Sequence, residues 1–359
     1  MRINYLDGLR GVAIILVLFF HAYSRWSSLV PYGETYAMFP VFKLGWLGVQ
    51  LFFMISGFVI FMTLEKTASL QRFLYKRWLR LFPAMLIASI LIFLTVPIFS
   101  ERPAGEPQLL DLLPGLTFME PRWWSRILGT ELASLEGAFW SLYVEFKFYL
   151  IAGTIYFTCG RRYLVPALFL MFACSAFASR SYPVVDIWFI DVAYEISTQL
   201  SFKYFGWFAA GAAFYLYHQC KLERWFILAL GIAFLSSIFV RDLSLGPAIG
   251  ALVISSLFAL SLKSPLIQNL LQSRVLLFFG LISYPLYLLH ENSMISMVMK
   301  MPVTFSWLPS FFYPFISISI LSGASYLIAN NYEVLVRKRI EAACLKLSKP
   351  GKASRSTSR

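Results

Sequence analysis

The sequence contains few charged side chains for its length. Only 14% of its 359 residues are charged and 59% are hydrophobic, whereas an average soluble protein is about 25% charged. The chain therefore lacks the polar residues needed to cover water-soluble domains, which excludes soluble, disordered and fibrous proteins. The composition predicts a polytopic membrane protein instead.

Cysteine and several familiar binding motifs are also scarce. The four cysteines show no paired spacing, so neither a disulfide framework nor a zinc site is indicated, and we expect no bound metal. The chain has no P-loop and no dinucleotide fingerprint, which leaves ATP-driven pumping and NAD chemistry without support. The net charge is +13, but the basic residues flank apolar runs. We therefore expect no nucleic-acid partner.

Ten apolar stretches are candidates for membrane-spanning helices, which need about 20 mostly apolar residues. They cover residues 9–28, 44–64, 81–99, 139–158, 163–179, 203–218, 225–240, 246–262, 275–295 and 309–329. The first lacks a small-residue cleavage site behind it and is interpreted as a retained segment. The predicted fold class is all-α, a polytopic membrane bundle of about ten transmembrane helices.

The basic residues are divided unevenly between the two sides of these spans. With the N-terminus inside, 21 of the 31 lysines and arginines fall on the inner side and eight on the outer side. Cytoplasmic loops carry such an excess, so both termini are expected to be cytoplasmic. We expect an integral-membrane domain over 1–345 and a basic, disordered tail over 346–359 that is attracted to anionic lipids.

The first span carries three ionisable residues, and such groups inside a bilayer are usually functional. At about 100° per residue, His21 lies within about 20° of Arg10 and about 40° of Asp7. The three share one face, on which Asp7 and Arg10 are close enough to pair. His21 is suited to accept a hydroxyl proton or to carry an acyl group. Alternatively, His21 only caps the outer end of the span and Arg10 marks its inner flank.

Arg77 and Arg80 lie three residues apart at the start of the third span, so they share a helix face. Two guanidinium groups placed in this way can bind phosphates. The alternative is that both belong to the positively charged flank that inner helix ends usually carry.

Later spans contain further ionisable residues. Glu145 lies in an apolar run, where it is either functional or paired with another helix. His290, near the outer end of the ninth span, is either part of a site or an interfacial residue, and His218 is expected to be structural. The run 48–57 contains small residues and is expected to let two helices approach closely.

Five stretches that contain these residues resemble, in order, the motifs of the membrane acyltransferase-3 family. They are YLDGLRGVAIILVLFFH, GVQLFFMISGFVI, KRWLRLFPA, WSLYVEFKFYL and SYPLYLLHE, in the first, second, third, fourth and ninth spans. Many members of this family have a second acid after the glutamate of the fourth motif. Phe146 stands at that place here, so the chain departs from the two-acid pattern.

The resemblance implies a ten-helix O-acyltransferase of the bacterial inner membrane. It would transfer an acyl group, most often acetyl, from acetyl-coenzyme A to a hydroxyl of a cell-surface or secreted saccharide. Acyl-coenzyme A, the saccharide and membrane lipids would be its partners. The implied site residues are His21, Arg10, Asp7 and Glu145 for catalysis, Arg77 and Arg80 for coenzyme A, and His290 and Tyr287 for the acceptor. Acids of the loop at 100–138 are expected to shape the acceptor cleft.

Two other functions remain open on the sequence alone. One is acyl transfer to a lipid-linked or small-molecule acceptor. The other is a transporter or flippase, in which the polar face of the first span serves as a path for protons or substrate. Such transporters are often built from inverted repeats, and we find no internal repeat in the sequence.

Overall fold

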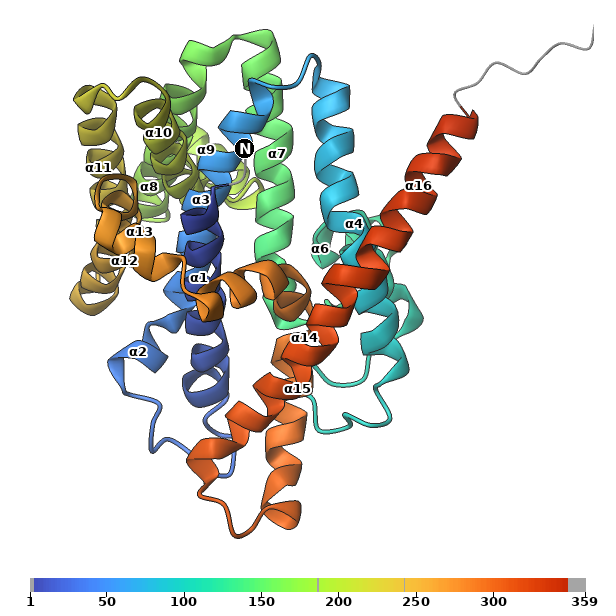
Figure 1. The fold of residues 1–359 in the computed structure, drawn as a ribbon. Coiled ribbons are helices and arrows are strands. Elements are labelled where there is room, and N and C mark those ends of the chain that lie inside the picture. The colour runs from blue at the N-terminus through green and yellow to red at the C-terminus, as the bar shows by residue number, and fades with distance from the viewer. Residues whose placement is uncertain (1–2, 186, 242, 348–359) are drawn as a thin grey trace, which may run out of the picture.

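The computed structural model describes residues 3–185, 187–241 and 243–347, and in these ranges it consists of helices joined by turns and loops, without a strand (Figure 1). This confirms the all-α prediction. Six segments of the described chain are long and apolar enough to cross a membrane: Asn4–Arg25, Gly45–Leu64, Leu70–Leu94, Arg161–Ser181, Leu245–Lys263 and Ser310–Cys344. A seventh is added if α13 (Pro265–Leu271) and α14 (Arg274–Thr304), which meet at 63°, form one broken span.

Each of the ten predicted spans overlaps a helix. In chain order these are α1 (Asn4–Phe20), α3 (Gly48–Leu64), α4 (Leu70–Leu94), α7 (Trp140–Thr158), α8 (Leu164–Ser181), α10 (Phe205–Cys220), α11 (Glu223–Ile238), α12 (Leu245–Lys263), α14 and α15 (Tyr313–Leu327). Two of them, α10 and α11, have only 16 residues each, which is short for a full crossing. The count of ten and the cytoplasmic termini therefore stay predictions.

The centre of the bundle is formed by α1, α3, α10 and α14, with α1 packed between α3 and α14 (Figure 1). Leu9, Ala13, Ile14 and Val17 of α1 are completely buried. A helix that is apolar on nearly all sides belongs in such a position, because burial removes the whole of its apolar surface from the surroundings. The polar residues of α1 are consequently held inside the protein.

Close approach of α3 and α10 depends on glycine. A Cβ atom on Gly57 would lie 2.1 Å from the carbonyl oxygen of Phe208, and one on Gly211 would lie 2.0 Å from that of Met54. Any larger residue would force the two backbones apart. The expected close helix contact of the run 48–57 is thus confirmed.

Glycines also allow close contact between α1 and the broken helix pair α13 and α14. A Cβ atom on Gly8 would lie 1.9 Å from the carbonyl oxygen of Leu271, and one on Gly280 would lie 2.0 Å from that of Asp7. The two backbones are therefore in contact near the N-terminal end of α1. This contact sets the register of α1 against α14, and hence which side chains face each other further along.

Several shorter elements complete the fold. They are the π-helical turn His21–Arg25 that continues α1, α2 (Pro40–Lys43), α5 (Leu112–Thr117), α6 (Pro121–Leu128), α9 (Trp188–Gln199) and the π-helical turn Ile328–Tyr332. The last of these turns leads into α16 (Glu333–Leu347), which extends diagonally along the bundle (Figure 1). Of the tail predicted at 346–359, only the first two residues are described, and they end α16; the rest lies outside the described residues.

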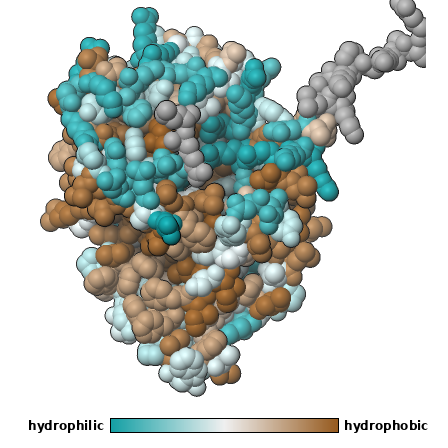
Figure 2. Space-filling view, in the orientation of Figure 1, coloured by the Kyte–Doolittle hydropathy of each residue, from teal (hydrophilic) through white to brown (hydrophobic). Residues whose placement is uncertain are grey.

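The surface separates into two zones in the view of Figure 2. Hydrophilic residues gather over the end of the bundle where α1 begins and along α16, whereas hydrophobic residues cover much of the middle and lower surface. Across the described chain, apolar side chains such as Leu94, Leu170 and Val253 are more than 60% exposed. An apolar belt of this kind fits contact with lipid.

Candidate active site

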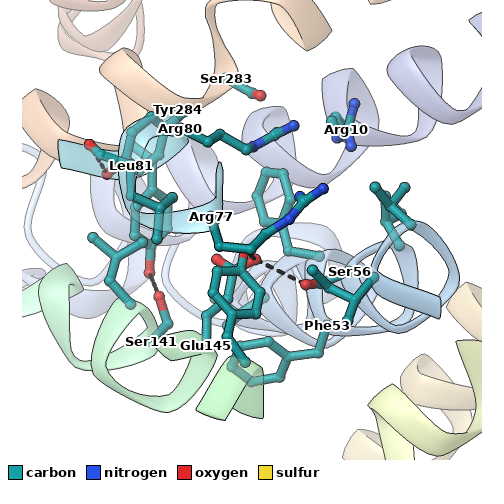
Figure 3. Close-up of a pocket in the computed structure, with 18 residues that line it drawn as sticks. Arg10, Phe53, Ser56, Arg77, Arg80, Leu81, Ser141, Glu145, Ser283 and Tyr284 are labelled. Carbon is teal, nitrogen blue, oxygen red and sulfur yellow. Dashed lines mark hydrogen bonds between the residues drawn. The ribbon is translucent and has the colours of Figure 1, made fainter. Parts of the chain in front are cut away.

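Three arginines line one cavity between α1, α3, α4, α7 and α14, which we call the arginine cavity. Arg10 is contributed by α1, and Arg77 and Arg80 are contributed by α4 (Figure 3). The third span was predicted to begin at residue 81, but α4 begins at Leu70. Arg77 and Arg80 therefore lie inside the helix and not in a flank before it. Three guanidinium groups around one cavity favour an anionic ligand.

Two of these arginines are held by neighbouring side chains. Arg10 Nη1 donates to Asp7 Oδ1 at 2.6 Å, which confirms the predicted pairing on α1. Arg77 Nη2 donates to Thr63 Oγ1 at 2.5 Å. Arg77 Nε is buried and finds no hydrogen-bond partner among the residues that the structure describes. A buried donor without a protein partner is normally satisfied by water, an ion or a ligand.

Glu145 lines the same cavity. Its Oε1 atom accepts hydrogen bonds from Ser56 Oγ at 2.8 Å and from the Tyr149 hydroxyl at 2.5 Å. Lys147, two residues later, turns elsewhere and contacts Glu120. The carboxylate thus lies with the arginines and is positioned by two hydroxyl groups.

A second cavity, which we call the histidine cavity, lies beyond the arginine cavity along α1. It is lined by His21, Trp26, Glu291 and Asn292, among others. His21 is the first residue of the π-helical turn at the end of α1. Single π-turns within helices often occur at functional sites. The His21 side chain is only 12% exposed.

The imidazole ring of His21 is positioned by a backbone carbonyl and by the ring of His290. Its Nδ1 atom lies 2.9 Å from the Val17 carbonyl oxygen and 3.2 Å from His290 Nε2. His290 Nδ1 in turn lies 2.8 Å from the Tyr287 carbonyl oxygen. A carbonyl only accepts, so both Nδ1 atoms carry the proton and His290 Nε2 accepts from His21. This leaves His21 Nε2, which lies 3.5 Å from Glu291 Oε1, as the atom available for proton transfer.

Glu291 was not anticipated from the sequence, although it directly follows His290 in the SYPLYLLHE stretch. Its Oε1 atom accepts from Trp26 Nε1 at 3.2 Å, while Oε2 is buried and has no hydrogen-bond partner among the described residues. Gly137 leaves room for this carboxylate, since a Cβ atom there would lie 2.7 Å from Oε2. Glu291 can therefore stabilise a protonated His21 and still accept one further hydrogen bond.

Tyr287 and Val49 line both cavities and form the wall between them. The Tyr287 hydroxyl donates to the Ala138 carbonyl oxygen at 2.9 Å and lies 2.7 Å from Ser141 Oγ. These bonds fix the ring at the boundary. The two cavities consequently meet at one ordered side chain.

The loop at 100–138 contributes to the histidine cavity through Ala104, Gly137 and Ala138. None of the acids of this loop is among the described residues that line the histidine cavity, so their role in shaping an acceptor cleft stays a prediction. Glu120 pairs with Lys147, and Glu101 pairs with Lys300 at 3.1 Å.

Glu136, another acid of this loop, is fully buried behind the histidine cavity. Its Oε2 atom accepts from the Asn292 backbone N–H at 2.9 Å. Burial, and then the nearby charge of Glu291, raise the pKa of Glu136 to about 8. The sequence offered no signal for this residue, because an acid in a polar loop normally lies in solvent.

The structure therefore divides the predicted site residues into two groups. The arginine cavity is lined by Arg10, Arg77, Arg80 and Glu145, and Asp7 is paired with Arg10. The histidine cavity is lined by His21 and Tyr287, and His290 packs behind His21. The prediction that Asp7, Arg10 and His21 act together is not tested by these contacts. His218 lies apart from both groups, with Nδ1 3.5 Å from the Tyr5 hydroxyl.

Comparison with known proteins agrees with this arrangement. Residues 3–329 match the protein family described as an acyltransferase domain. A stretch of 162 residues is 30% identical to the peptidoglycan O-acetyltransferase OatA of Listeria monocytogenes and covers 41% of this chain. The match spans 23% of that relative's length. No solved structure gives a significant match. By the extent of the family match, the chain belongs to the acyltransferase-3 family.

Proposed function

We propose that this acyltransferase moves an acetyl group from acetyl-coenzyme A to a hydroxyl of a saccharide at the bacterial inner membrane. One observation carries the proposal: a cavity with three arginines and a cavity with His21 meet at Tyr287 and Val49. This is the arrangement needed when an anionic donor and a hydroxyl acceptor enter from different ends. The similarity to a protein named for O-acetylation of peptidoglycan supports a saccharide acceptor.

The residues of the arginine cavity fit the donor. Coenzyme A carries several phosphates, and guanidinium groups bind phosphate through paired, charge-assisted hydrogen bonds. Arg77 Nε is a buried donor that lacks a partner among the described residues, and a phosphate oxygen would satisfy it. Arg10, Arg77 and Arg80 would hold the phosphates, and the bound donor would supply an activated thioester.

His21 is the proposed base. Its Nε2 atom removes the proton from the acceptor hydroxyl while that oxygen attacks the acyl carbon. As the carbon–sulfur bond breaks, His21 returns the proton to the departing thiolate, so that an ester and a free thiol are formed. Glu291, 3.5 Å away, stabilises the imidazolium that exists between the two transfers. His290 fixes the ring orientation through its 3.2 Å contact with Nδ1.

The decisive experiment follows thiol release from acetyl-coenzyme A by the purified protein in nanodiscs. A saccharide acceptor mixture is added, and the wild type is compared with His21→Ala and with the double variant Arg77→Ala/Arg80→Ala. We expect release to fall at least about 100-fold in His21→Ala, because loss of a general base typically costs 10²- to 10⁴-fold. The arginine variant should show a higher KM for acetyl-coenzyme A.

His218→Ala is the matched control, because this histidine lines neither cavity. It should release thiol at the wild-type rate. Full activity of a folded His21→Ala variant contradicts the mechanism. Transport of a solute without thiol release from folded wild-type protein favours the transporter alternative, and a labelled product that is lipid-soluble favours a lipid-linked acceptor.

A further inference from the structure

A third cavity extends the histidine cavity sideways, and we call it the aromatic cavity. It shares Arg25, Trp46 and Trp140 with the histidine cavity. Its far side is formed by the start of α10 and the chain just after α11. The two cavities therefore adjoin at these three side chains, near the end of α1. A chain-like ligand with one unit at His21 would place its neighbouring units in the aromatic cavity.

The charge around this cavity is positive. Arg25, Lys203 and Arg241 line it from three different segments, and all three side chains are exposed. In the described ranges of the chain, no Asp or Glu lines the cavity, and none lies in a salt bridge with these three residues. Arg25 and Lys203 lie over aromatic rings, each 5.0 Å from the ring centroid. Such a concave patch concentrates anions.

The walls between these cations are aromatic. Trp140 packs against Tyr204 with ring centroids 5.1 Å apart, and Trp46 faces the same space. Aromatic rings that are partly exposed offer apolar surface with a polar edge, which suits the C–H faces and hydroxyl rims of sugar rings. An ordinary lipid chain would need no polar group in the wall.

Gln50 supplies such a polar group. It is only 3% exposed, lines the aromatic cavity, and its Oε1 atom has no hydrogen-bond partner among the described residues. An amide oxygen needs a donor. A sugar hydroxyl provides one, whereas a phosphate or carboxylate does not.

We propose that the aromatic cavity binds the sugars next to the acetylated unit, and that this acceptor chain is anionic, with a carboxylate or phosphodiester on a neighbouring unit. Arg25, Lys203 and Arg241 would bind the anionic group, while Trp46, Trp140 and Gln50 would hold the sugar itself. The inference rests on the proposed function, because it assumes that the acceptor reaches His21. It adds the chemical class of the acceptor.

The test measures binding separately from acetyl transfer. The full chain in nanodiscs of zwitterionic lipid is titrated with two anionic probes, tetragalacturonate and a glycerol-phosphate oligomer, and with the methyl ester of tetragalacturonate as the neutral match. We expect at least one anionic probe to bind about tenfold more tightly than the ester at low salt, as two or three partly exposed charge contacts would give. The preference should shrink at high ionic strength.

Variants locate the effect. Lys203→Gln/Arg241→Gln should lower the affinity for the preferred anionic probe about tenfold and leave binding of the ester unchanged. Gln50→Leu should weaken both probes to a similar extent, because it removes the acceptor for a hydroxyl. Lys43→Gln is the control, since Lys43 is an exposed cation that lines none of the three cavities. It should bind all probes as the wild type does.

Three results would overturn the inference. The first is equal binding, or equal absence of binding, for the anionic probes and the ester. The second is a loss of affinity in Lys43→Gln as large as that in the double variant. The preference for anionic probes would then come from the overall positive charge of the protein and not from the aromatic cavity. The third is loss of the preference when anionic lipid is added to the nanodiscs, which would assign the cavity to a lipid headgroup. Thiol release from acetyl-coenzyme A by the wild type reports on the proposed function independently of all three.

Discussion

Replacement of Gly280 by alanine should push α14 away from α1 and slow acyl transfer. The added Cβ atom would lie 2.0 Å from the Asp7 carbonyl oxygen, whereas ordinary contact starts at 3.4 Å, so the backbones must separate by about 1.4 Å. Overpacking of this kind costs about 1–3 kcal/mol of stability. His290 lies ten residues further along α14, so part of the shift reaches its 3.2 Å contact with His21.

The expected effect on the rate is larger than the effect on stability. A misplacement of about 1 Å in a catalytic site can cost about 100-fold, so we expect turnover to fall between about 10- and 100-fold while the protein stays folded. Thiol release and thermal unfolding are measured on the same nanodisc sample. Gly323→Ala in α15 is the matched control, because a Cβ atom there has no atom within 4 Å.

Two outcomes would refute this reasoning. In one, Gly280→Ala keeps wild-type turnover although its unfolding temperature falls, which would show that the α1–α14 spacing does not govern the His21 contacts. In the other, Gly323→Ala loses as much activity as Gly280→Ala. The loss would then come from helix composition and not from the close approach.

Three further predictions concern other parts of the site. The pKa of Glu136 is raised to about 8, so between about pH 5 and 8 the folded protein keeps a proton that the unfolded chain, with the ordinary glutamate pKa of 4.5, has released. The unfolding temperature should therefore fall as the pH rises from about 5 to 8, and it should fall less steeply in Glu136→Gln. Equal slopes of unfolding temperature against pH in the wild type and Glu136→Gln would contradict this. Lys147→Met should cost at least about 2 kcal/mol in thermal unfolding, because it breaks a mostly buried pair with Glu120, whereas Lys263→Met breaks an exposed pair and should leave the unfolding temperature nearly unchanged. Arg77→Lys should raise the KM for acetyl-coenzyme A about tenfold with kcat nearly unchanged, since lysine keeps the charge but not the forked geometry; a fall in kcat alone would contradict a binding role.

Local patterns in the sequence predicted local structure well. Apolar stretches located helices, and the three-residue spacing of Asp7 and Arg10 predicted an ion pair that the structure confirms at 2.6 Å. Small residues at 48–57 predicted close packing, which the contact of Gly57 with the Phe208 backbone confirms. Each of these features depends on residues a few positions apart, so periodicity is sufficient to find them.

Long-range contacts were beyond such patterns. Arg10 and His21 share a helix face, but eleven residues separate them by about 16 Å along the axis, and they line different cavities. The partners of His21 come from α14, more than 260 residues later, through a register that glycine contacts set. Glu136 and Glu291 were missed because only the folded chain shows that both are buried.

The wall of Tyr287 and Val49 has a consequence for the cell that contains this protein. A membrane stores energy as an ion gradient, and an unbroken file of water through a protein would discharge it. Here the two cavities approach each other without merging, and a hydrogen-bonded aromatic ring stands between them. In the proposed reaction only the thioester end of the donor reaches past this ring, and its phosphates stay with the three arginines. A charged metabolite can then serve as donor on one side of an insulating barrier without ever crossing it.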